Sequence, residues 1–600
     1  MTTTTFSAGT VVASSWLNDV NTYVYKNTWN ILNDGVDNTG LVDATSLINA
    51  RIVTLNAAGG GTIVFPTGTY LVKDITLLSN VNLVAGGKVT LVKNGGTDET
   101  HLFTGTGTIG TGSLLTANAT ANAWSCTVTS AAGFTANTYV LLRDNTYISG
   151  AAGRNQEILY ITNIASTTIT FNRPLTHTYT TANAATLLPL SPLENVVIGG
   201  FTGTIAAVGG GNVGGHVDLN YAVNCVVTQN TFSGSGGDAA IRFKTCYLSS
   251  VTNNLLMNGQ NMSAAGFGYG IEFDEATHYC TVTGNKTVNV RENTFTNRTN
   301  YCLFAHNVVL GSYDTSFNTH GAGVHNCVIQ DNVLVGTQTG YGISVGFGTH
   351  TAGDYSCDFI DNKIANTASH GISINAPSGL PNSNIRVKGN TIENPGVSTG
   401  SSVGVTMTYT NSSEIKDNTI VGTNTNVLSG ITISNSTSPL VENNIIQDIP
   451  NGYGITYTTL TSGTIRNNFF TGVSSYNVRG TGTSTGVKVI NNEADDTLTQ
   501  MPATGYTSKG NSWSLAYGST TYDPPSLADG AGATTTVTVT GAALGDYASA
   551  AFSVALTGVT VTAWVSAANT VSVRFQNESG GVVDLASGTL TAYIEKVVNV

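Results

Sequence analysis

Four charged residues spaced two apart are the sequence's best candidates for chemistry. Arg242 and Lys244 stand on either side of a phenylalanine, and Glu272 and Asp274 do the same thirty residues later. Alternate residues of one strand lie about 6.6 Å apart, within the separation of roughly 5–9.5 Å that two carboxyl groups need for glycoside hydrolysis. Glu272 and Asp274 are therefore candidates for an acid and for a base or nucleophile. The two basic residues could hold one carboxylate ionised or bind an acidic sugar.

A second group of candidates follows in the segment SYDTSFNTHGAGVHN. It contains Asp314 and His320, and an imidazole close to carboxylates can serve as a general acid or base. We expect both residues one to two repeats of the chain beyond Glu272, with His320 stacked above it. Five further side chains are predicted to contact a sugar: Arg242, Lys244, Arg298, Tyr279 and Tyr301.

These residues also have plainer interpretations. Opposite charges on neighbouring strands stabilise each other by roughly 0.2–1 kcal/mol, so the charged group could be structural. A histidine at a turn is more often a surface polar group than a catalytic one. We assign no function to His306, His350 and His370, which have no carboxylate partner nearby.

Motifs for other kinds of chemistry are missing from the sequence. It contains no HExxH, no zinc-type set of cysteines and histidines, no GxSxG and no phosphate-binding loop. The runs of glycine are typical of turns. We therefore predict neither a metal nor a cofactor.

The elements that must position the charged residues repeat along the chain. Between Asn220 and Asp496 a unit recurs in which alternating apolar positions precede an asparagine, as in CVVTQNTF, CVIQDNVLV and PLVENNIIQ. Successive asparagines lie 22 to 31 residues apart, which is the range of stacked supersecondary units. The repeated residues are Asn230, Asn254, Asn285, Asn307, Asn332, Asn362, Asn390, Asn418, Asn444, Asn468 and Asn492.

Alternation with a period of two inside each unit indicates strands, so the sequence predicts an all-β chain built around a parallel β-helix. Asparagine tolerates the left-handed conformation and hydrogen-bonds neighbouring backbone; we expect it to bend each coil and form an amide ladder. Gly-Ile or Gly-Val pairs mark another corner, and this phase turns Ile271 and Phe273 inward. Glu272 and Asp274 then face outward, stacked beside the two basic residues of the previous coil.

The cysteines fit the same repeat. Five of the seven precede a repeated asparagine by five residues and should form an interior column. Small buried apolar thiols are the expected state, with disulfides or metal ligands as the alternatives. These five are Cys225, Cys280, Cys302, Cys327 and Cys357.

Composition and charge exclude several classes of protein. Only 10% of residues are charged and the net charge is −12, with no basic block, which argues against a nucleic-acid partner. No apolar run approaches the roughly 18 residues of a membrane span. The N-terminus lacks a basic segment followed by an apolar one, so no secretory signal is expected. Free thiols fit a chain made in a reducing cytoplasm.

Changes of pattern divide the chain into segments. A short amphipathic helix precedes a capping region, and strands without the asparagine marker interrupt the coils once. The predicted segments are an attachment segment at 1–30, a cap with the first coils at 31–97, an inserted β-domain at 98–190, the β-helix at 191–497, a linker at 498–525 and a β-sandwich at 526–600.

One resemblance follows from the N-terminal motifs. D-G-V-D-N, D-A-T and GGGTIVFPTGTYLV resemble the start of pectate-lyase-like β-helix proteins, especially bacteriophage tailspikes, and the WLNDVN segment resembles the virion-binding tip of phage tail proteins. The resemblance covers roughly residues 10–500. It implies a right-handed parallel β-helix, a homotrimer, attachment to other tail proteins through the N-terminus, and a C-terminal module for trimerisation or receptor contact.

The resulting hypothesis is a virion tail protein that binds and cleaves a bacterial surface polysaccharide by hydrolysis or β-elimination. Such a protein is made in the host cytoplasm and acts at the outer surface of the host cell. A rival hypothesis is a non-catalytic fibre or adhesin, in which the β-helix is a spacer and the C-terminal sandwich binds the receptor. A third is a free bacterial polysaccharide lyase, which the missing secretory signal and the WLNDVN segment disfavour.

Overall fold

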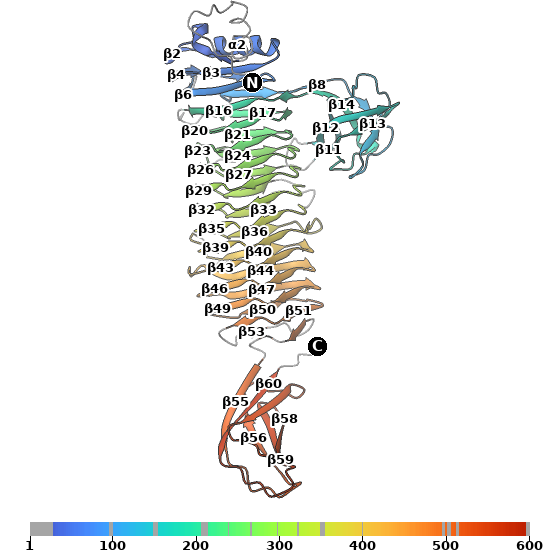
Figure 1. Ribbon diagram of the computed structural model, residues 1–600, viewed down its shortest axis with the longest axis vertical. Coiled ribbons are helices and arrows are strands. Elements are labelled where there is room, and N and C mark those ends of the chain that lie inside the picture. Colours follow the sequence, from blue (N-terminus) through green and yellow to red (C-terminus); the bar gives the residue numbers. More distant parts are fainter. Residues whose placement is uncertain are drawn as a thin grey trace, which may run out of the picture. The chain divides into compact units, whose positions relative to one another are not determined.

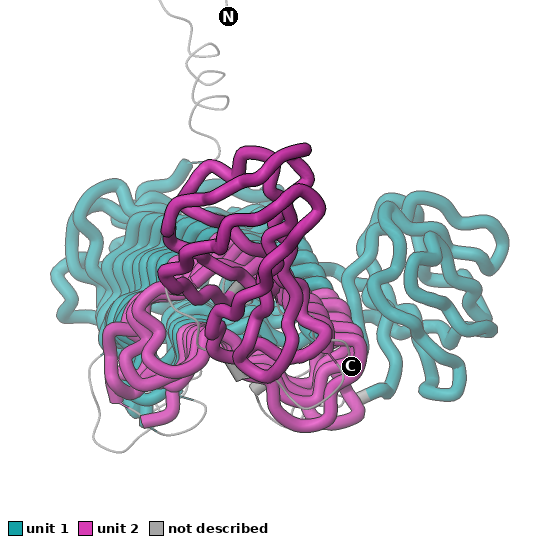
Figure 2. Tube along the Cα trace, turned by 90° about the horizontal axis from the view of Figure 1, so that it is seen from below, with its two compact units in different colours: residues 1–368 teal, residues 369–600 magenta. Residues whose placement is uncertain are grey.

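The structure is a computed structural model that divides into two compact units, residues 1–368 and 369–600 (Figure 2). The predicted attachment segment lies almost wholly outside the described residues. The structure describes residues 28–94, 100–147, 154–205, 214–237, 239–263, 267–296, 298–320, 323–347, 354–398, 400–494, 499–500, 506–509, 511 and 515–595.

The first unit begins with a cap over the end of the coils. A 3-10 helix, η2 (Ile31–Asp34), and one α-helix, α2 (Thr45–Ala57), precede the first long strands. The α-helix buries Ile48, Ile52 and Leu55, spaced as one helical face. It covers apolar surface that an open solenoid end would expose.

Two parallel sheets form the solenoid of the first unit (Figure 1). The first contains β1 (Thr28–Asn30), β2 (Thr39–Asp43), β3 (Gly61–Phe65), β4 (Gly68–Val72), β6 (Val81–Lys93), β16 (Val197–Thr204), β19 (Val226–Thr228), β20 (Thr231–Ser233), β22 (Ser250–Thr252), β23 (Leu255–Met257), β25 (Thr281–Thr283), β26 (Lys286–Val288), β28 (Leu303–Ala305), β29 (Val308–Ser312), β31 (Val328–Gln330), β32 (Val333–Thr337), β34 (Asp358–Ile360) and β35 (Lys363–Ala365). The second contains β5 (Ile75–Thr76), β7 (Phe103–Thr106), β17 (Val217–Asn220), β21 (Ala239–Lys244), β24 (Tyr269–Asp274), β27 (Asn293–Thr296), β30 (Phe317–His320) and β33 (Ile343–Phe347); β15 (Leu193–Glu194) pairs with β18 (Ala222–Val223).

The coils are interrupted by an antiparallel sheet, called here the small domain (Figure 1). Its own apolar core includes Leu142, Leu159 and Phe171. Its elements are β8 (Thr108–Ile109), β9 (Ser113–Leu114), β10 (Ser125–Thr127), β11 (Tyr139–Tyr147), β12 (Arg154–Ala165), β13 (Thr168–Phe171), η3 (Thr181–Asn183) and β14 (Thr186–Ser191).

The second unit contains further coils and a two-sheet module at the end of the chain. Strands of the first kind are β38 (Arg386–Lys388), β39 (Thr391–Glu393), β42 (Glu414–Lys416), β43 (Thr419–Val421), β45 (Leu440–Glu442), β46 (Ile445–Ile449), β48 (Thr464–Arg466), β49 (Phe469–Val473), β51 (Val487–Ile490), β52 (Glu493–Ala494) and β54 (Tyr506–Lys509). Strands of the second kind are β36 (Ile372–Asn375), β37 (Asn382–Ser383), β40 (Ser402–Thr408), β41 (Thr410–Asn411), β44 (Val427–Thr437), β47 (Tyr453–Thr461), β50 (Val478–Thr481) and β53 (Thr499–Gln500).

The C-terminal module is a pair of three-stranded antiparallel sheets around one apolar core. Its strands are β55 (Leu515–Tyr522), β56 (Gly532–Thr538), β57 (Tyr547–Phe552), β58 (Val559–Ala567), β59 (Thr570–Asn577) and β60 (Gly588–Glu595). Residues 498–525, predicted as a linker, thus contain β53, β54 and the whole of β55. This segment is rich in polar residues and contains prolines, which suggested a linker. Its strands nevertheless form pairs: β53 and β54 pair with strands of the coils, and β55 pairs with β60 of the module.

The predicted amide ladder is present in the coils of both units. The backbone N–H and the side-chain amide of Asn285 both donate to Oδ1 of Asn307, at 2.9 and 3.1 Å. Asn444 makes the same pair of bonds to Asn468. Asn511, which the repeat did not reveal, extends the ladder by accepting two bonds from Asn492. The ladder residues are 0–2% exposed.

One detail of that prediction is wrong. The residue with the left-handed backbone is the one before each ladder asparagine, for example Asn253, His306 and Asn443, with φ of 57°, 55° and 55°. The ladder asparagine itself turns inward, where its amide donates to a backbone carbonyl of the preceding coil. The five-cysteine column is buried and its thiols are free, as predicted.

Candidate functional site

The register of four neighbouring strands places the predicted charged residues. Arg242 of β21 lies opposite Glu272 of β24, and Lys244 lies opposite Asp274. Between them Phe243 stacks on Phe273 inside the solenoid, with ring centroids 5.3 Å apart. Because alternate side chains of a strand point to opposite faces, the four charged residues share the outward face.

Continuing the register gives two columns of outward side chains, called here the carboxylate face. One column contains Asp218, Arg242, Glu272, Thr294 and Asn318. The other contains Lys244, Asp274, Thr296 and His320. His320 therefore lies two coils beyond Asp274, about 10 Å away at the usual strand spacing.

The basic residues of this face are paired with carboxylates that the sequence analysis did not select. Arg242 forms a two-bond pair with Asp218, at 3.0 and 2.8 Å. Burial favours the protonated acid, but the hydrogen bonds and charge of Arg242 outweigh it and lower the pKa of Asp218. Lys244 pairs with Glu275 at 2.7 Å. Burial opposes the charge on Lys244, yet its bond to Glu275 raises the pKa of the amine.

Asp274 is held in position by two hydrogen bonds. Its Oδ1 accepts from the hydroxyl of Thr296 on the next coil and from the backbone N–H of Glu275, the latter at 2.8 Å. Both Asp274 and Glu272 are half-buried. The face therefore presents two partly accessible carboxyl groups on one strand, one of them oriented by a neighbouring hydroxyl.

A third carboxyl group, Glu292, lies beside this face and was not selected as a catalytic candidate. Its side chain is 2% exposed, and its Oε2 accepts from Nδ2 of Asn318 at 3.1 Å. Burial, reinforced by the negative charge of Asp314, raises the pKa of Glu292 to about 8, which favours the protonated acid near neutral pH. Asp314 is bound by Arg291 at 3.3 Å.

Polar atoms near Glu292 are left for a further partner. Oγ1 of Thr294 and Oδ1 of Asn318 are buried and have no hydrogen-bond partner among the described residues. Buried polar atoms are normally paired, so these two mark a place for water or a ligand. The burial of Glu292 depends on neighbours from other coils, such as Asn318 and Asp314.

The two predicted aromatic residues form a stack at a turn. The rings of Tyr279 and Tyr301 are parallel, with centroids 4.8 Å apart, and Tyr301 is 40% exposed. Both residues have φ of 55°, a conformation that bulky side chains rarely adopt. Such strain persists only where the surrounding structure holds it, and it is common at binding sites.

Arg298 lies away from the carboxylate face. Its guanidinium donates to Oδ1 of Asn155 in the small domain at 3.0 Å, and burial lowers its pKa. Tyr279 also contacts the small domain, because the guanidinium of Arg173 lies 5.1 Å from its ring centre. The predicted binding residues thus fall into two groups, one on the carboxylate face and one at the small domain.

Two features are absent from the part of the chain that the structure describes: a metal-binding group of side chains and a membrane-spanning helix. The described residues contain no group of three or more histidine, cysteine or acidic side chains placed to hold a metal ion. Within the same ranges, no helix has the length and apolar character required to cross a membrane.

Comparison with known proteins identifies the fold. Residues 313–494 match the family model of the right-handed beta helix region, and no curated protein sequence matches the chain. Together with the coils described above, this match gives a right-handed parallel β-helix.

Solved tailspike structures share the architecture at low sequence identity. A tailspike of Acinetobacter baumannii bacteriophage AP22, in complex with a capsular saccharide, has a TM-score of 0.52 and 13% identity, covering 99% of this chain and 100% of that one. The tailspike of Pseudomonas phage LKA1 gives 0.55 and 11%, covering 94% and 99%. A mutant tailspike of E. coli bacteriophage HK620, in complex with a pentasaccharide, gives 0.52 and 13%, covering 96% and 94%. At these identities the likeness establishes the fold.

Proposed function

We propose that this chain is a phage tailspike that binds and depolymerises a bacterial surface polysaccharide during adsorption to the host. The observation that carries the proposal is the carboxylate face, where Glu272 and Asp274 lie on one strand beside the buried carboxyl of Glu292, whose pKa burial raises. The saccharide complexes of tailspikes with the same fold support a sugar ligand.

The proposed roles follow from the geometry. Glu272 and Asp274 act as acid and as base or nucleophile, about 6.6 Å apart along the strand. The hydroxyl of Thr296 orients the carboxylate of Asp274. His320 and Asp314 are second candidates for proton transfer. The unpaired atoms of Thr294 and Asn318 are suited to sugar hydroxyls, which both donate and accept hydrogen bonds.

Binding is proposed to extend beyond the reacting bond. Arg242 and Lys244 border the carboxylate face, and Tyr301 offers an exposed ring to the apolar side of a sugar. Tyr279 and Arg298 would contribute at the edge of the small domain. No cofactor or metal is required for this chemistry.

The proposed biological setting is the phage tail. The chain would form a homotrimer, which can shelter coil faces and sugar grooves between subunits, and would attach to other tail proteins through residues 1–30. It would be synthesised in the host cytoplasm and act at the outer surface of the next host. Nucleic acid and membrane insertion have no part in this proposal, consistent with a net charge of −12.

One observation favours the rival function, a non-catalytic fibre. Arg242 and Lys244 are engaged by Asp218 and Glu275, an arrangement that also serves simply to stabilise neighbouring strands. In that case the coils are a stiff spacer and the C-terminal module binds the receptor. The two functions differ in whether any glycosidic bond is broken.

The test uses the purified full chain and capsule or lipopolysaccharide from the host. New reducing ends without absorbance from unsaturated uronates indicate a hydrolase, and both signals together indicate a lyase. Binding without new reducing ends would overturn the proposed cleavage and establish the fibre. Substrate binding is measured in parallel, so that a wrong polysaccharide is recognised by the absence of both binding and cleavage.

A further inference from the structure

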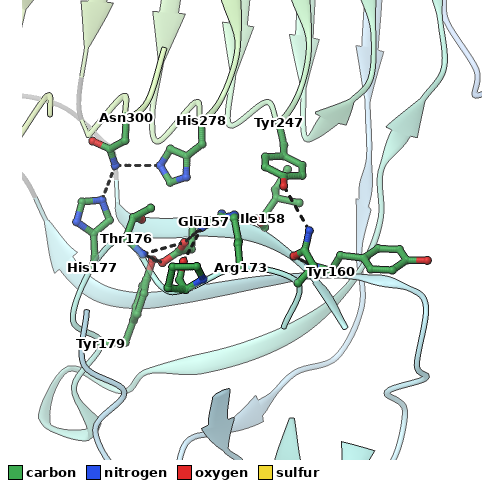
Figure 3. A network of polar contacts seen from close by, with 12 residues as sticks. Glu157, Ile158, Tyr160, Arg173, Thr176, His177, Tyr179, Tyr247, His278 and Asn300 are labelled. Carbon is green, nitrogen blue, oxygen red and sulfur yellow. Dashed lines mark hydrogen bonds and ion pairs between the residues drawn. The ribbon is translucent and has the colours of Figure 1, made fainter. Parts of the chain in front are cut away.

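The small domain contacts the solenoid along a row of turns. In five successive coils Tyr247, His278, Asn300, His325 and Tyr355 pair one above another as isolated bridges. The small domain meets this row with residues of β12 and of the segment after β13, as Figure 3 shows. The docking interface, as the term is used below, contains Glu157, Arg173 and His177 of the small domain and Tyr247, His278, Asn300 and His325 of the solenoid.

One half of the docking interface is apolar and aromatic. Leu141, Ile158 and Leu188 of the small domain belong to a buried cluster that also contains Val223 and Tyr247 of the solenoid. The guanidinium of Arg173 lies 5.3 Å from the ring centre of Tyr247 and is bound by Glu157 at 2.5 Å. Glu157 also accepts from the backbone N–H of Thr176 and the hydroxyl of Tyr179. This half consists of apolar and ring contacts and one buried ion pair, and it contains no histidine.

The other half buries three histidines. His177, His278 and His325 are 7%, 1% and 1% exposed, and the rings of His177 and His325 lie 4.9 Å apart. Nδ2 of Asn300 lies 2.8 Å from Nε2 of His177 and 3.2 Å from Nε2 of His278 (Figure 3). With the amide in this orientation, Nδ2 of Asn300 donates and Nε2 of His177 accepts, which fits a neutral imidazole.

Most of the charged groups near the three histidines disfavour protonation of the imidazole rings. Burial is the main cause of the lowered pKa values of the three imidazoles. The positive charges of Arg173 and Arg298 lower these pKa values further. The carboxylates around the cluster have partners of their own: Glu157 is bound by Arg173, and Asp144 interacts with Arg298. Asp354, next to the Tyr355 ring that stacks on His325, accepts from the hydroxyl of Thr319 and from the backbone N–H of Val324, and burial raises its pKa to about 7. The carbonyl of Arg298, 3.3 Å from Nε2 of His278, favours a proton there but does not offset burial.

We propose that the docking interface is an acid-sensitive latch, in which protonation of His177, His278 and His325 releases the small domain from the solenoid. At neutral pH the three rings are uncharged and packed, and the interface is closed. In acid, up to three positive charges would be forced between Arg173 and Arg298 in a buried site. Separation of the small domain returns the imidazoles to water and relieves this cost.

The direction of the pH dependence follows from the lowered pKa values. Burial holds the pKa of His325 at about 3 and those of His177 and His278 well below 6.5, whereas an undocked imidazole titrates near 6.5. The docked state thus binds fewer protons. Docking is strongest above pH 6.5 and weakens as the pH falls below it, by up to about tenfold per pH unit for each histidine.

The experiment measures hydrogen exchange of the full chain by mass spectrometry between pH 7.5 and 4.5, with each rate corrected for its intrinsic pH dependence. Peptides from β12 and from the turns at 247 and 278 report opening of the docking interface. Peptides from β59 and β60 are the internal reference, because residues 515–595 contain no histidine. We expect the opening constant at the docking interface to rise by up to roughly 170-fold between pH 6.5 and 5.5, about 5.5-fold for each of three histidines that titrate near 6.5 when undocked, with the reference unchanged.

Two variants separate histidine protonation from other effects of acid. His177→Gln keeps an acceptor for Asn300 but cannot be protonated, so the pH dependence should lose about one tenfold step per unit. His306→Gln is the matched control, because His306 is a largely exposed histidine of the same solenoid, and it should behave as wild type.

Three results would overturn the latch. One is wild-type protection at the docking interface that persists unchanged to pH 4.5. Another is a His177→Gln protein, docked at neutral pH, with an undiminished pH dependence, which would assign the effect to carboxylates such as Glu157. If His177→Gln is already undocked at pH 7.5, the test depends on the wild-type protein. A wild-type opening constant that changes with pH by the equivalent of one proton or less would contradict the coupled protonation of three histidines.

Discussion

Two stretches of the solenoid share one backbone plan and carry different side chains. In the first, residues 239–320, the outward positions after the inward Ile271 are Glu272 and Asp274. In the second, residues 402–481, the matching positions after Ile431 are Thr432 and Ser434. There one column, Thr408, Ser434, Thr458 and Thr481, is a ladder of hydroxyl groups, with the hydroxyls of Thr458 and Thr481 2.6 Å apart. The other column contains Thr406, Thr432 and Thr456 and ends in Arg479.

The turn before each coil shows the same contrast. The left-handed position is occupied by Leu248, Tyr279 and Tyr301 in the first stretch, and by Ser412, Ser438 and Ser462 in the second, with φ between 48° and 56° throughout. Serine accepts this conformation with less crowding than a tyrosine. The second stretch shows what the fold alone needs, so the departures in the first stretch indicate where a function has replaced the structural default.

The largest expected effect is on polysaccharide cleavage, and it should distinguish the outward carboxyl groups of the first stretch from the outward hydroxyl groups of the second. Glu272→Gln or Asp274→Asn should reduce polysaccharide cleavage by about 10²–10⁴-fold, the usual contribution of a general acid or base, and leave binding in place. Thr432→Val, at the matched position of the second stretch, should leave the cleavage rate unchanged. The measurement is the rate of new reducing ends. Full activity in both carboxylate variants would place the chemistry elsewhere, with Glu292→Gln the next variant to assay.

The second effect should be equal in the two stretches. Asn285→Ala and Asn444→Ala each remove an amide that bridges neighbouring coils and leave buried backbone groups unpaired. Each should cost about 2–4 kcal/mol of stability, from several bonds near 1 kcal/mol and one or more unsatisfied groups. Thermal unfolding midpoints of both variants test this. A loss confined to one stretch would contradict a common scaffold.

The smallest effect is expected at the turn. Tyr301→Ser installs the residue type of the second stretch, which relieves left-handed strain but removes the ring stacked on Tyr279. These terms oppose each other, so stability should change by less than about 1 kcal/mol. Saccharide affinity should fall about fivefold, measured by titration calorimetry, whereas Ser438→Ala should leave it unchanged. Unaltered affinity in Tyr301→Ser would remove this ring from the binding site.

Much of the fold was predictable because a solenoid is a local repeat. The asparagine spacing and the Gly-Ile corner correctly placed Phe243 on Phe273 and Arg242 beside Glu272. The left-handed residue was misplaced by one position, because asparagines at both positions of a bend, such as Asn253 and Asn254, have the same propensities. Only burial of the second one distinguishes them.

The position of the candidate site could be predicted from the sequence, but the ion pairs of its charged residues could not. Arg242 was expected to act on Glu272, and the pair it forms with Asp218 depends on a strand from the previous coil whose sequence lacks the usual marker. The raised pKa of Glu292 arises from burial and from Asp314, 22 residues away. Both properties require neighbours that the repeat does not specify.

The sequence by itself determined the coils, their register and which side chains face outward, because each depends on local periodicity and on turn residues. The tertiary structure alone decided which charges pair, which carboxyl group is protonated, and that His177 meets His278 and His325. Those properties depend on distances and desolvation among residues up to about 150 positions apart. The inserted small domain, which follows none of the repeat, brings those residues together.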